Sequence, residues 1–91
     1  MQKEIRCTIT GRVQLVMFRD FAERKARSLG ITGTVQNMPD GSVWVVAQGE
    51  ESVLEKYIAH LQKGSVLSRV DKVSVIWSDM ASSFSDFEIL Y

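Results

Sequence analysis

Apolar and polar residues alternate along residues 4–13, and this period of two predicts a strand with one buried face. The residues on that face are Ile5, Cys7, Ile9, Gly11 and Val13. From Phe18 the spacing of apolar residues lengthens to that of an amphipathic helix. The apolar face of this helix carries Phe18, Phe21, Ala22, Ala26 and Leu29. Gly30 stands where a helix commonly ends, so the chain is predicted to open with a strand and a helix.

Two runs rich in β-forming residues follow, at residues 31–38 and 42–48. They are separated by Pro39-Asp40-Gly41, which is typical of a tight turn because proline presets φ and glycine accepts a positive φ. Residues 50–63 return to helical spacing, and Gly64 stands at the predicted end of this helix. Its apolar positions are Val53, Leu54, Tyr57, Ile58 and Leu61. A hairpin followed by a second helix is therefore predicted.

Two further strands are predicted at residues 70–78 and 84–91. Their apolar faces carry Val73, Val75 and Trp77 in the first and Phe87, Ile89 and Tyr91 in the second. The order of strands and helices predicts an α+β domain with the ferredoxin-like, split βαβ arrangement. Two helices should then cover one face of a mostly antiparallel sheet. No linker or repeat interrupts residues 1–91, so we expect a single domain, of a fold that by itself implies no function.

The charges balance, with 11 Lys and Arg against 11 Asp and Glu. A protein that binds nucleic acid without regard to sequence needs a basic excess, so that class is disfavoured. The longest wholly apolar run, residues 43–47, is far shorter than the roughly 20 residues that span a bilayer, and the first residues do not resemble a signal peptide. Cys7 is the one cysteine. We therefore expect no intrachain disulfide and a location in the reducing cytoplasm.

The segment between the first strand and the first helix, residues 11–19, contains groups that could bind a ligand. A short loop that enters a helix directs free backbone N–H groups and the positive end of the helix dipole toward one point, which suits an anion. Arg19, in the first turn of the predicted helix, adds a guanidinium that can hold two phosphate oxygens. Taken alone, the segment is more simply a connecting loop with a solvated arginine, because such joints are common.

Two runs resemble the signatures of the acylphosphatase family. The first is Ile9-Thr10-Gly11-Arg12-Val13-Gln14-Leu15-Val16-Met17-Phe18-Arg19, and the second is Gly33-Thr34-Val35-Gln36-Asn37-Met38-Pro39-Asp40-Gly41-Ser42-Val43, continuing to Gly49. The ending Phe87-Glu88-Ile89 also fits, so the resemblance covers nearly the whole chain. The sequence departs from the family pattern at Leu15, where a second glycine is usual, and at Thr34, where an aromatic residue is usual.

The resemblance implies an enzyme that hydrolyses acyl phosphates to a carboxylate and inorganic phosphate, without a metal or other cofactor. A carboxylate leaves readily, since its conjugate acid has a pKa of about 4, so no strong general acid is needed. The family pattern implies that Asn37 orients the attacking water and that loop N–H groups and Arg19 hold the phosphoryl group. The substrate-binding residues so implied are Gln14, Leu15, Val16, Met17, Phe18 and Arg19. The partner implied is a small acyl phosphate. Independently of the resemblance, a small domain with a single site is most simply a monomer.

A different class of function stays open. Because Leu15 replaces the usual glycine, the alternative is a catalytically weak module that binds phosphate or an acyl phosphate. Taken alone, Asn37 is also explained as a turn residue, because asparagine before Met38-Pro39-Asp40-Gly41 favours a turn. His60 and Cys7 are interpreted as a surface histidine and a buried strand thiol. An RNA-binding sheet is disfavoured because no strand is rich in aromatic residues, and a metal carrier would need a cysteine pair in the first loop.

Overall fold

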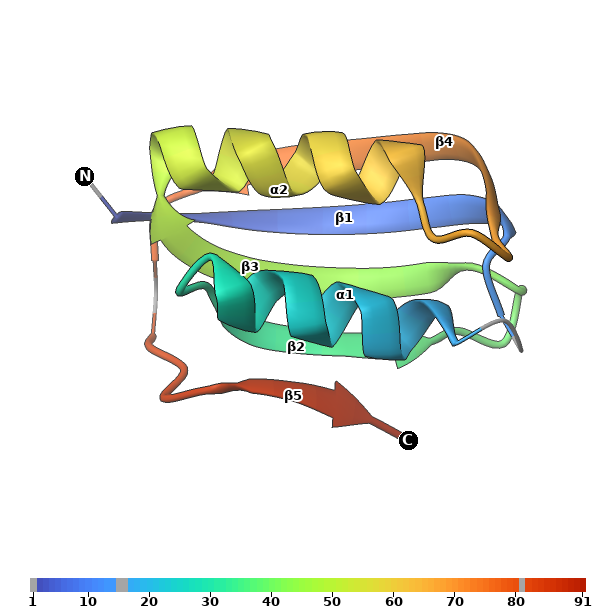
Figure 1. Cartoon of the computed structure of the whole chain (residues 1–91). Coiled ribbons are helices and arrows are strands. Elements are labelled where there is room, and N and C mark those ends of the chain that lie inside the picture. The colour runs from blue at the N-terminus through green and yellow to red at the C-terminus, as the bar shows by residue number, and fades with distance from the viewer. Residues whose placement is uncertain (1, 15–16, 81) are drawn as a thin grey trace.

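The computed structural model describes residues 2–14, 17–80 and 82–91 of the chain (Figure 1). Its elements are β1 (Gln2–Arg12), α1 (Phe18–Ser28), β2 (Thr32–Asn37), β3 (Val43–Glu50), α2 (Glu51–Lys63), β4 (Arg69–Ser78) and β5 (Phe87–Leu90). They follow in the order predicted from the sequence. The predicted elements are therefore confirmed, with ends that differ by a few residues.

The strands form one sheet in the order β4-β1-β3-β2-β5. Neighbouring strands are antiparallel except β2 and β5, which run parallel. Both helices lie on the same face of the sheet, with α1 against β2 and β5 and α2 against β4 and β3 (Figure 1). The predicted ferredoxin-like α+β arrangement is confirmed. Neither α1 nor α2, nor any other helix in the described ranges, has the length and apolar character needed to cross a bilayer.

The buried face of β1 shows why an alternating pattern forms a strand here. Ile5, Cys7 and Ile9 are wholly buried on the side of the helices. Burial of a large aliphatic side chain contributes about 1.5–3 kcal/mol, so this face holds the strand in place. The Tyr57 hydroxyl donates a hydrogen bond of 2.9 Å to the Ala22 carbonyl, which joins the two helices inside the core. Other core residues are Phe18, Ala26, Val35, Val43, Val45, Ala47, Leu54, Leu61 and Phe87.

Two residues with reactive side chains have ordinary structural surroundings. Burial raises the pKa of the Cys7 thiol to about 12, so the thiol stays protonated at neutral pH. The interpretation of Cys7 as a buried strand thiol is confirmed. His60 lies in the last turn of α2 and is half-buried rather than fully at the surface. Its carbonyl accepts the Gly64 N–H at 2.9 Å, where the helix ends.

The last strand is shorter than the prediction over residues 84–91, since β5 spans Phe87–Leu90. The cause is the side chain of Gln48. Its amide nitrogen donates to the Ser82 carbonyl at 2.7 Å, and its amide oxygen accepts the Phe84 N–H at 3.1 Å. Residues 82–84 thus bond to a side chain, and backbone bonding to β2 begins at Asp86, whose carbonyl accepts the Gly33 N–H at 2.9 Å. Tyr91 follows β5 and is 99% exposed, so it does not continue the buried face that alternation predicted.

Three strands end at the same end of the sheet. Because β1 and β2 are both antiparallel to β3, they run in the same direction, and β5 is parallel to β2. The last residues of β1, β2 and β5 therefore lie at the end of the sheet where α1 begins (Figure 1). The turn between β2 and β3 and the connection from α2 to β4 lie there as well.

Candidate active site

The loop between β1 and α1 enters the helix without a side-chain cap. Met17 is the N-cap residue, and its backbone is left-handed, with φ 59° and ψ 27°. No side chain of the described residues bonds to the first N–H groups of α1, which a serine or aspartate at the N-cap would do. Phe18, the first residue of α1, is buried and anchors the helix in the core. The helix therefore presents N–H groups without a side-chain cap, and the positive end of its dipole, at this end of the sheet.

Gln14 joins this loop to the β2–β3 hairpin. Its side-chain amide donates to the Met38 carbonyl at 2.9 Å and to the Ser42 carbonyl at 2.8 Å. The hairpin is closed by its own bonds, since the Asp40 carboxylate accepts the Ser42 hydroxyl at 2.6 Å and the Ser42 N–H at 2.9 Å. These hydrogen bonds lower the pKa of Asp40. The sequence predicted a role for the backbone of Gln14 and did not predict this bridge by its side chain. A polar side chain directly after a strand is only a weak sign of such a bridge.

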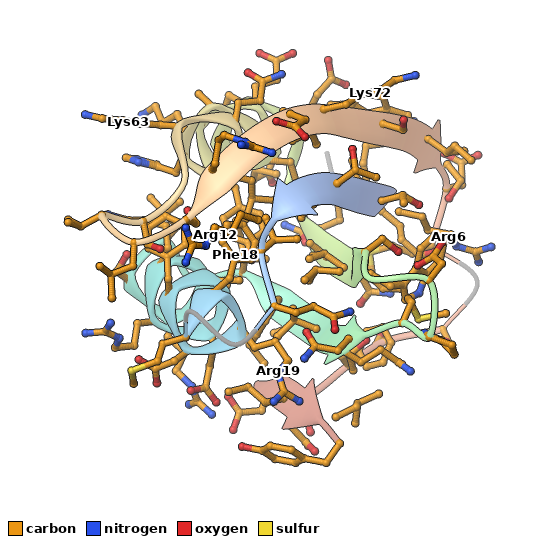
Figure 2. All side chains as sticks on the ribbon, turned by 90° about the vertical axis from the view of Figure 1, so that its right-hand side faces the viewer. Arg6, Arg12, Phe18, Arg19, Lys63 and Lys72 are labelled. Atoms are coloured by element: carbon orange, nitrogen blue, oxygen red, sulfur yellow. The ribbon has the colours of Figure 1, made fainter. Side chains whose placement is uncertain are left out.

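Arg19 is docked on the end of β5. Its Nη1 donates a hydrogen bond of 3.3 Å to the Leu90 carbonyl. Its guanidinium carbon lies 4.7 Å from the centroid of the Tyr91 ring, within the range of a cation–π contact. Figure 2 shows Arg19 at the end of the molecule that also carries Arg12 and Phe18. Sequence reasoning found Arg19 but missed the strand end that holds it.

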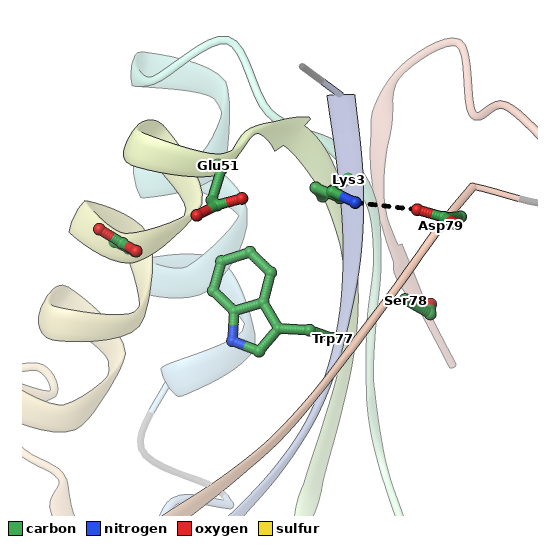
Figure 3. A pocket seen from close by; sticks show the side chains of 6 residues that line it. Lys3, Glu51, Trp77, Ser78 and Asp79 are labelled. Atoms are coloured by element: carbon green, nitrogen blue, oxygen red, sulfur yellow. Dashed lines mark hydrogen bonds and ion pairs between the residues drawn. The ribbon is translucent and has the colours of Figure 1, made fainter.

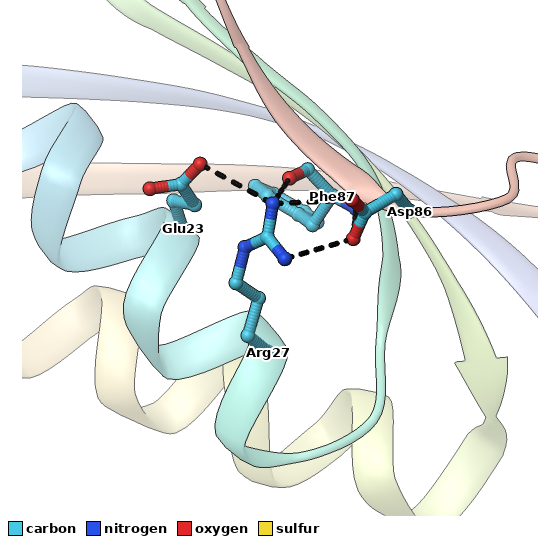
Figure 4. Close-up of polar contacts among 4 residues, drawn as sticks. All are labelled: Glu23, Arg27, Asp86 and Phe87. Atoms are coloured by element: carbon cyan, nitrogen blue, oxygen red, sulfur yellow. Dashed lines mark hydrogen bonds and ion pairs between the residues drawn. The ribbon is translucent and has the colours of Figure 1, made fainter.

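A second arginine of α1 holds the beginning of β5 (Figure 4). Arg27 Nη2 donates to the Phe87 carbonyl at 2.8 Å, and Arg27 Nη1 lies 3.0 Å from Asp86 Oδ1. Glu23, one turn earlier, lies 3.7 Å from the same guanidinium. Since Arg19, Glu23 and Arg27 follow at successive turns, they lie along one side of α1. The two arginines thus fix β5 beside the helix, and Arg27 helps to set the position of the strand end that Arg19 contacts.

Arg19 and Asn37 line the same pocket. Its volume is about 230 Å³, and its other lining residues are Val13, Met17 and Phe18. Asn37 Oδ1 is buried, and among the described residues it has no hydrogen-bond partner. A buried acceptor without a partner costs about 1–3 kcal/mol. This atom is therefore suited to accept a hydrogen bond from a bound water or ligand.

The site residues predicted from the sequence fall into two groups. Those that the structure describes lie together around the loop and the pocket: Gln14, Met17, Phe18, Arg19 and Asn37. Leu15 and Val16 lie outside the described residues, so their predicted part in binding rests on the sequence. Within residues 2–14, 17–80 and 82–91, no three His, Cys, Asp or Glu side chains gather as ligands for a metal ion.

A larger hollow, of about 540 Å³, lies at the opposite end of the sheet (Figure 3). Its cation is paired, since Lys3 Nζ lies 2.9 Å from Asp79 Oδ1. The hydrogen bond to Asp79 raises the pKa of Lys3. Glu51 and Glu55 also line the hollow. Because carboxylates surround a cation that is already paired, this hollow disfavours an anionic ligand, and the smaller pocket beside Arg19 is the candidate active site.

Known proteins match this chain over nearly its whole length. The family model described as acylphosphatase matches residues 5–89. The acylphosphatase of Methanococcoides burtonii is 46% identical over 81 residues, which cover 89% of this chain and 84% of that protein. The acylphosphatase of Salinibacter ruber is 44% identical over 88 residues, with 97% and 93% covered. The crystal structure of acylphosphatase from Bacillus subtilis matches with a TM-score of 0.95 and 34% identity, over 98% of this chain and 99% of that one. By the family model, by sequence identity and by fold, this chain belongs to the acylphosphatase family.

Proposed function

We propose that this chain hydrolyses acyl phosphates, splitting the bond between the acyl oxygen and phosphorus to give a carboxylate and inorganic phosphate. The observation that carries the proposal is that one pocket is lined by the Arg19 guanidinium, by the start of α1 and by Asn37. The first two attract an anion. The third contributes a buried acceptor that has no partner among the described residues and can orient a water molecule.

The phosphoryl group binds at the start of α1 in this proposal. Backbone N–H groups of residues 14–18 and the helix dipole stabilise the charge on its oxygens. Arg19 adds a bidentate, charge-assisted contact. The hydrogen bond to Leu90 uses one of the five N–H donors of a guanidinium, so Arg19 can contact β5 and the phosphoryl group at the same time. These contacts strengthen in the transition state, where charge is spread over the equatorial oxygens.

Asn37 orients the attacking water. Its Oδ1 accepts a hydrogen bond from the water, which directs a lone pair of the water oxygen toward phosphorus, in line with the leaving group. The water oxygen bonds to phosphorus while the bond from phosphorus to the acyl oxygen breaks, and the electron pair of that bond leaves with the carboxylate. One proton stays on the water oxygen, and the other moves to a phosphate oxygen. The carboxylate leaves without a proton from a side chain because it is a weak base.

Release of inorganic phosphate from acetyl phosphate, with a chelator of divalent cations present, tests the proposal. Arg19→Ala should lower kcat/KM by more than about 100-fold, the scale of one lost preorganised donor. Arg69→Ala is the matched control, since it removes the same charge from a side chain that is 73% exposed and is paired with Asp71. Arg69→Ala should retain wild-type activity. Activity of Arg19→Ala within a few-fold of the wild type would contradict the role of Arg19.

A module that binds phosphate or an acyl phosphate with little turnover is the second candidate. Leu15, at the position of the usual loop glycine, is the residue that favours it. The two candidates share the anion-binding features at the start of α1, so binding alone does not separate them. Binding of inorganic phosphate by calorimetry, without release of phosphate from acetyl phosphate, would support this second candidate.

We further propose that residues 1–91 act as one domain, as a monomer and in the cytoplasm. Cys7, a free and buried thiol, is consistent with a reducing compartment. Light scattering of the purified protein tests the monomer. Fractionation of the cells that produce the protein tests the location.

A further inference from the structure

A second pocket adjoins the candidate active site, and most of its lining is apolar. Its volume is about 400 Å³, within the range of roughly 300–1,000 Å³ for small-molecule sites. Met17 and Phe21 contribute from the start of α1, and Val66 and Leu67 contribute from the connection between α2 and β4. Figure 1 shows this connection at the same end of the molecule as the start of α1. The pocket therefore lies between a helix and a turn that are far apart in the chain.

Met17 lines both pockets. It contributes to the pocket of Arg19 and Asn37 and also to the apolar pocket. Its φ of 59° is uncommon for a residue with a side chain, and it presents a side chain that is 71% exposed at the boundary between the two pockets. A substrate whose phosphoryl group binds beside Arg19 can therefore extend past Met17 into the apolar pocket.

The wall opposite α1 is a turn held by its own hydrogen bonds. The Ser65 N–H donates to Ser68 Oγ at 2.8 Å, and the Ser68 hydroxyl donates to the Ser65 carbonyl at 3.0 Å. Gly64 has φ 77°, and a Cβ at this position would lie 2.6 Å from Ser68 Oγ, so the turn requires glycine here. The turn presents Val66 and Leu67 with 100% and 69% exposure. These two aliphatic side chains are exposed to solvent on an ordered turn and lie next to other apolar groups. Such an exposed apolar patch indicates a contact surface.

The charged side chain that lines the apolar pocket is already paired with a carboxylate. Among the described residues that line it, Arg24 is the charged one. Arg24 Nε lies 2.9 Å from Asp20 Oδ2, one turn earlier on α1. An anion therefore gains little from this pocket, whereas a hydrocarbon group gains by covering Met17 and Leu67. This pocket therefore favours an apolar group, whereas the pocket beside Arg19 favours the phosphoryl group.

We propose that the apolar pocket is the subsite for the acyl group, and that the preferred substrates are acyl phosphates with apolar acyl groups of several carbons. The inference rests on the proposed function, because it assigns the other half of the same substrate. The acyl chain lies between Met17 and Leu67, while the phosphoryl group contacts Arg19. Each methylene that becomes buried should strengthen binding about fourfold.

The test compares acetyl phosphate with hexanoyl phosphate, which share the reacting bond and differ in the length of the alkyl chain. In the wild type, kcat/KM for hexanoyl phosphate should exceed that for acetyl phosphate by at least about tenfold. Leu67→Ala should lower the ratio of these two values by at least about fivefold, because it removes one wall of the pocket. Leu67→Met, which keeps an apolar wall, should retain the wild-type ratio.

Ile76→Ala is the matched control, because it shortens an aliphatic side chain on β4 that is 63% exposed, close to the exposure of Leu67. It should keep the wild-type ratio. If neither substrate releases phosphate, the proposed function is overturned and this inference with it. If both are hydrolysed with equal kcat/KM, or if Leu67→Ala keeps the wild-type ratio, the acyl subsite is overturned and the proposed function stands. An equal fall of the ratio in Ile76→Ala would also overturn the subsite.

Discussion

The guanidinium carbon of Arg19 lies 4.7 Å from the centroid of the Tyr91 ring. The residue proposed to hold the phosphoryl group is therefore itself held by the residue that follows β5. Parallel pairing places Gln36 of β2 opposite Leu90 of β5, so the same strand end lies beside the end of β2 that carries Asn37. The start of α1 and the end of β5 together set the position of one cation, next to the end of β2.

Tyr91→Ala should lower kcat/KM about two- to fivefold and raise the inhibition constant of inorganic phosphate. A cation–π contact at an exposed site contributes about 0.5–1 kcal/mol, and its loss frees the guanidinium of Arg19 to move. The melting midpoint should stay at the wild-type value, because the Tyr91 side chain is exposed. Tyr91→Phe keeps the ring and should restore both constants. Wild-type kinetics in Tyr91→Ala would show that the contact does not position Arg19.

Asn37→Ala should lower kcat about 100-fold while the inhibition constant of inorganic phosphate changes by less than about threefold. Placement of the water matters in the transition state, whereas the loop and Arg19 hold phosphate. The variant also removes a buried oxygen that has no partner among the described residues, so the melting midpoint should not fall. Equal losses of turnover and phosphate affinity would instead make Asn37 a binding residue.

Gln14→Ala should lower the free energy of unfolding by about 1–3 kcal/mol, because it removes two hydrogen bonds that join the loop to the hairpin. The effect of Gln14→Ala on kcat should be coupled to the effect of Asn37→Ala on kcat. In a double-mutant cycle, Asn37→Ala should cost less kcat in the Gln14→Ala background than in the wild type. Gln62→Ala, at an exposed position of α2, is the control for the loss of a glutamine. Strict additivity of the two changes would mean that Gln14 acts on stability alone.

Leu15→Gly should keep or raise turnover, because glycine is the usual residue of the family at this position. A glycine also makes the unfolded chain freer, which lowers the free energy of unfolding by about 0.4–1 kcal/mol. The measurements are kcat/KM and the melting midpoint of this one variant. A sharp loss of activity would show that Leu15 has a positive part in the loop, such as covering the acyl group.

The sequence by itself determined the elements and the family. The alternation of Ile5, Cys7 and Ile9 requires only that one side of a strand is buried, and helical spacing requires only that one side of a helix is buried. Both are local properties that can be read without knowing the neighbouring element. The two signature runs likewise contain Arg19 and Asn37, one residue in each run, so the candidate chemistry could be predicted before the fold was known.

The tertiary structure alone decided which residues meet around that chemistry. Arg19 and Leu90 are 71 positions apart, and Gln14 and Ser42 are 28 apart. These contacts depend on the strand order and on the parallel pairing of β2 with β5, and no local pattern encodes either of them. In the sequence Leu67 is an ordinary loop residue, and it lines the apolar pocket only because its turn lies beside α1. The physical reason is that periodicity specifies which face of an element is buried, whereas the partner of that face is chosen by the packing of the whole chain.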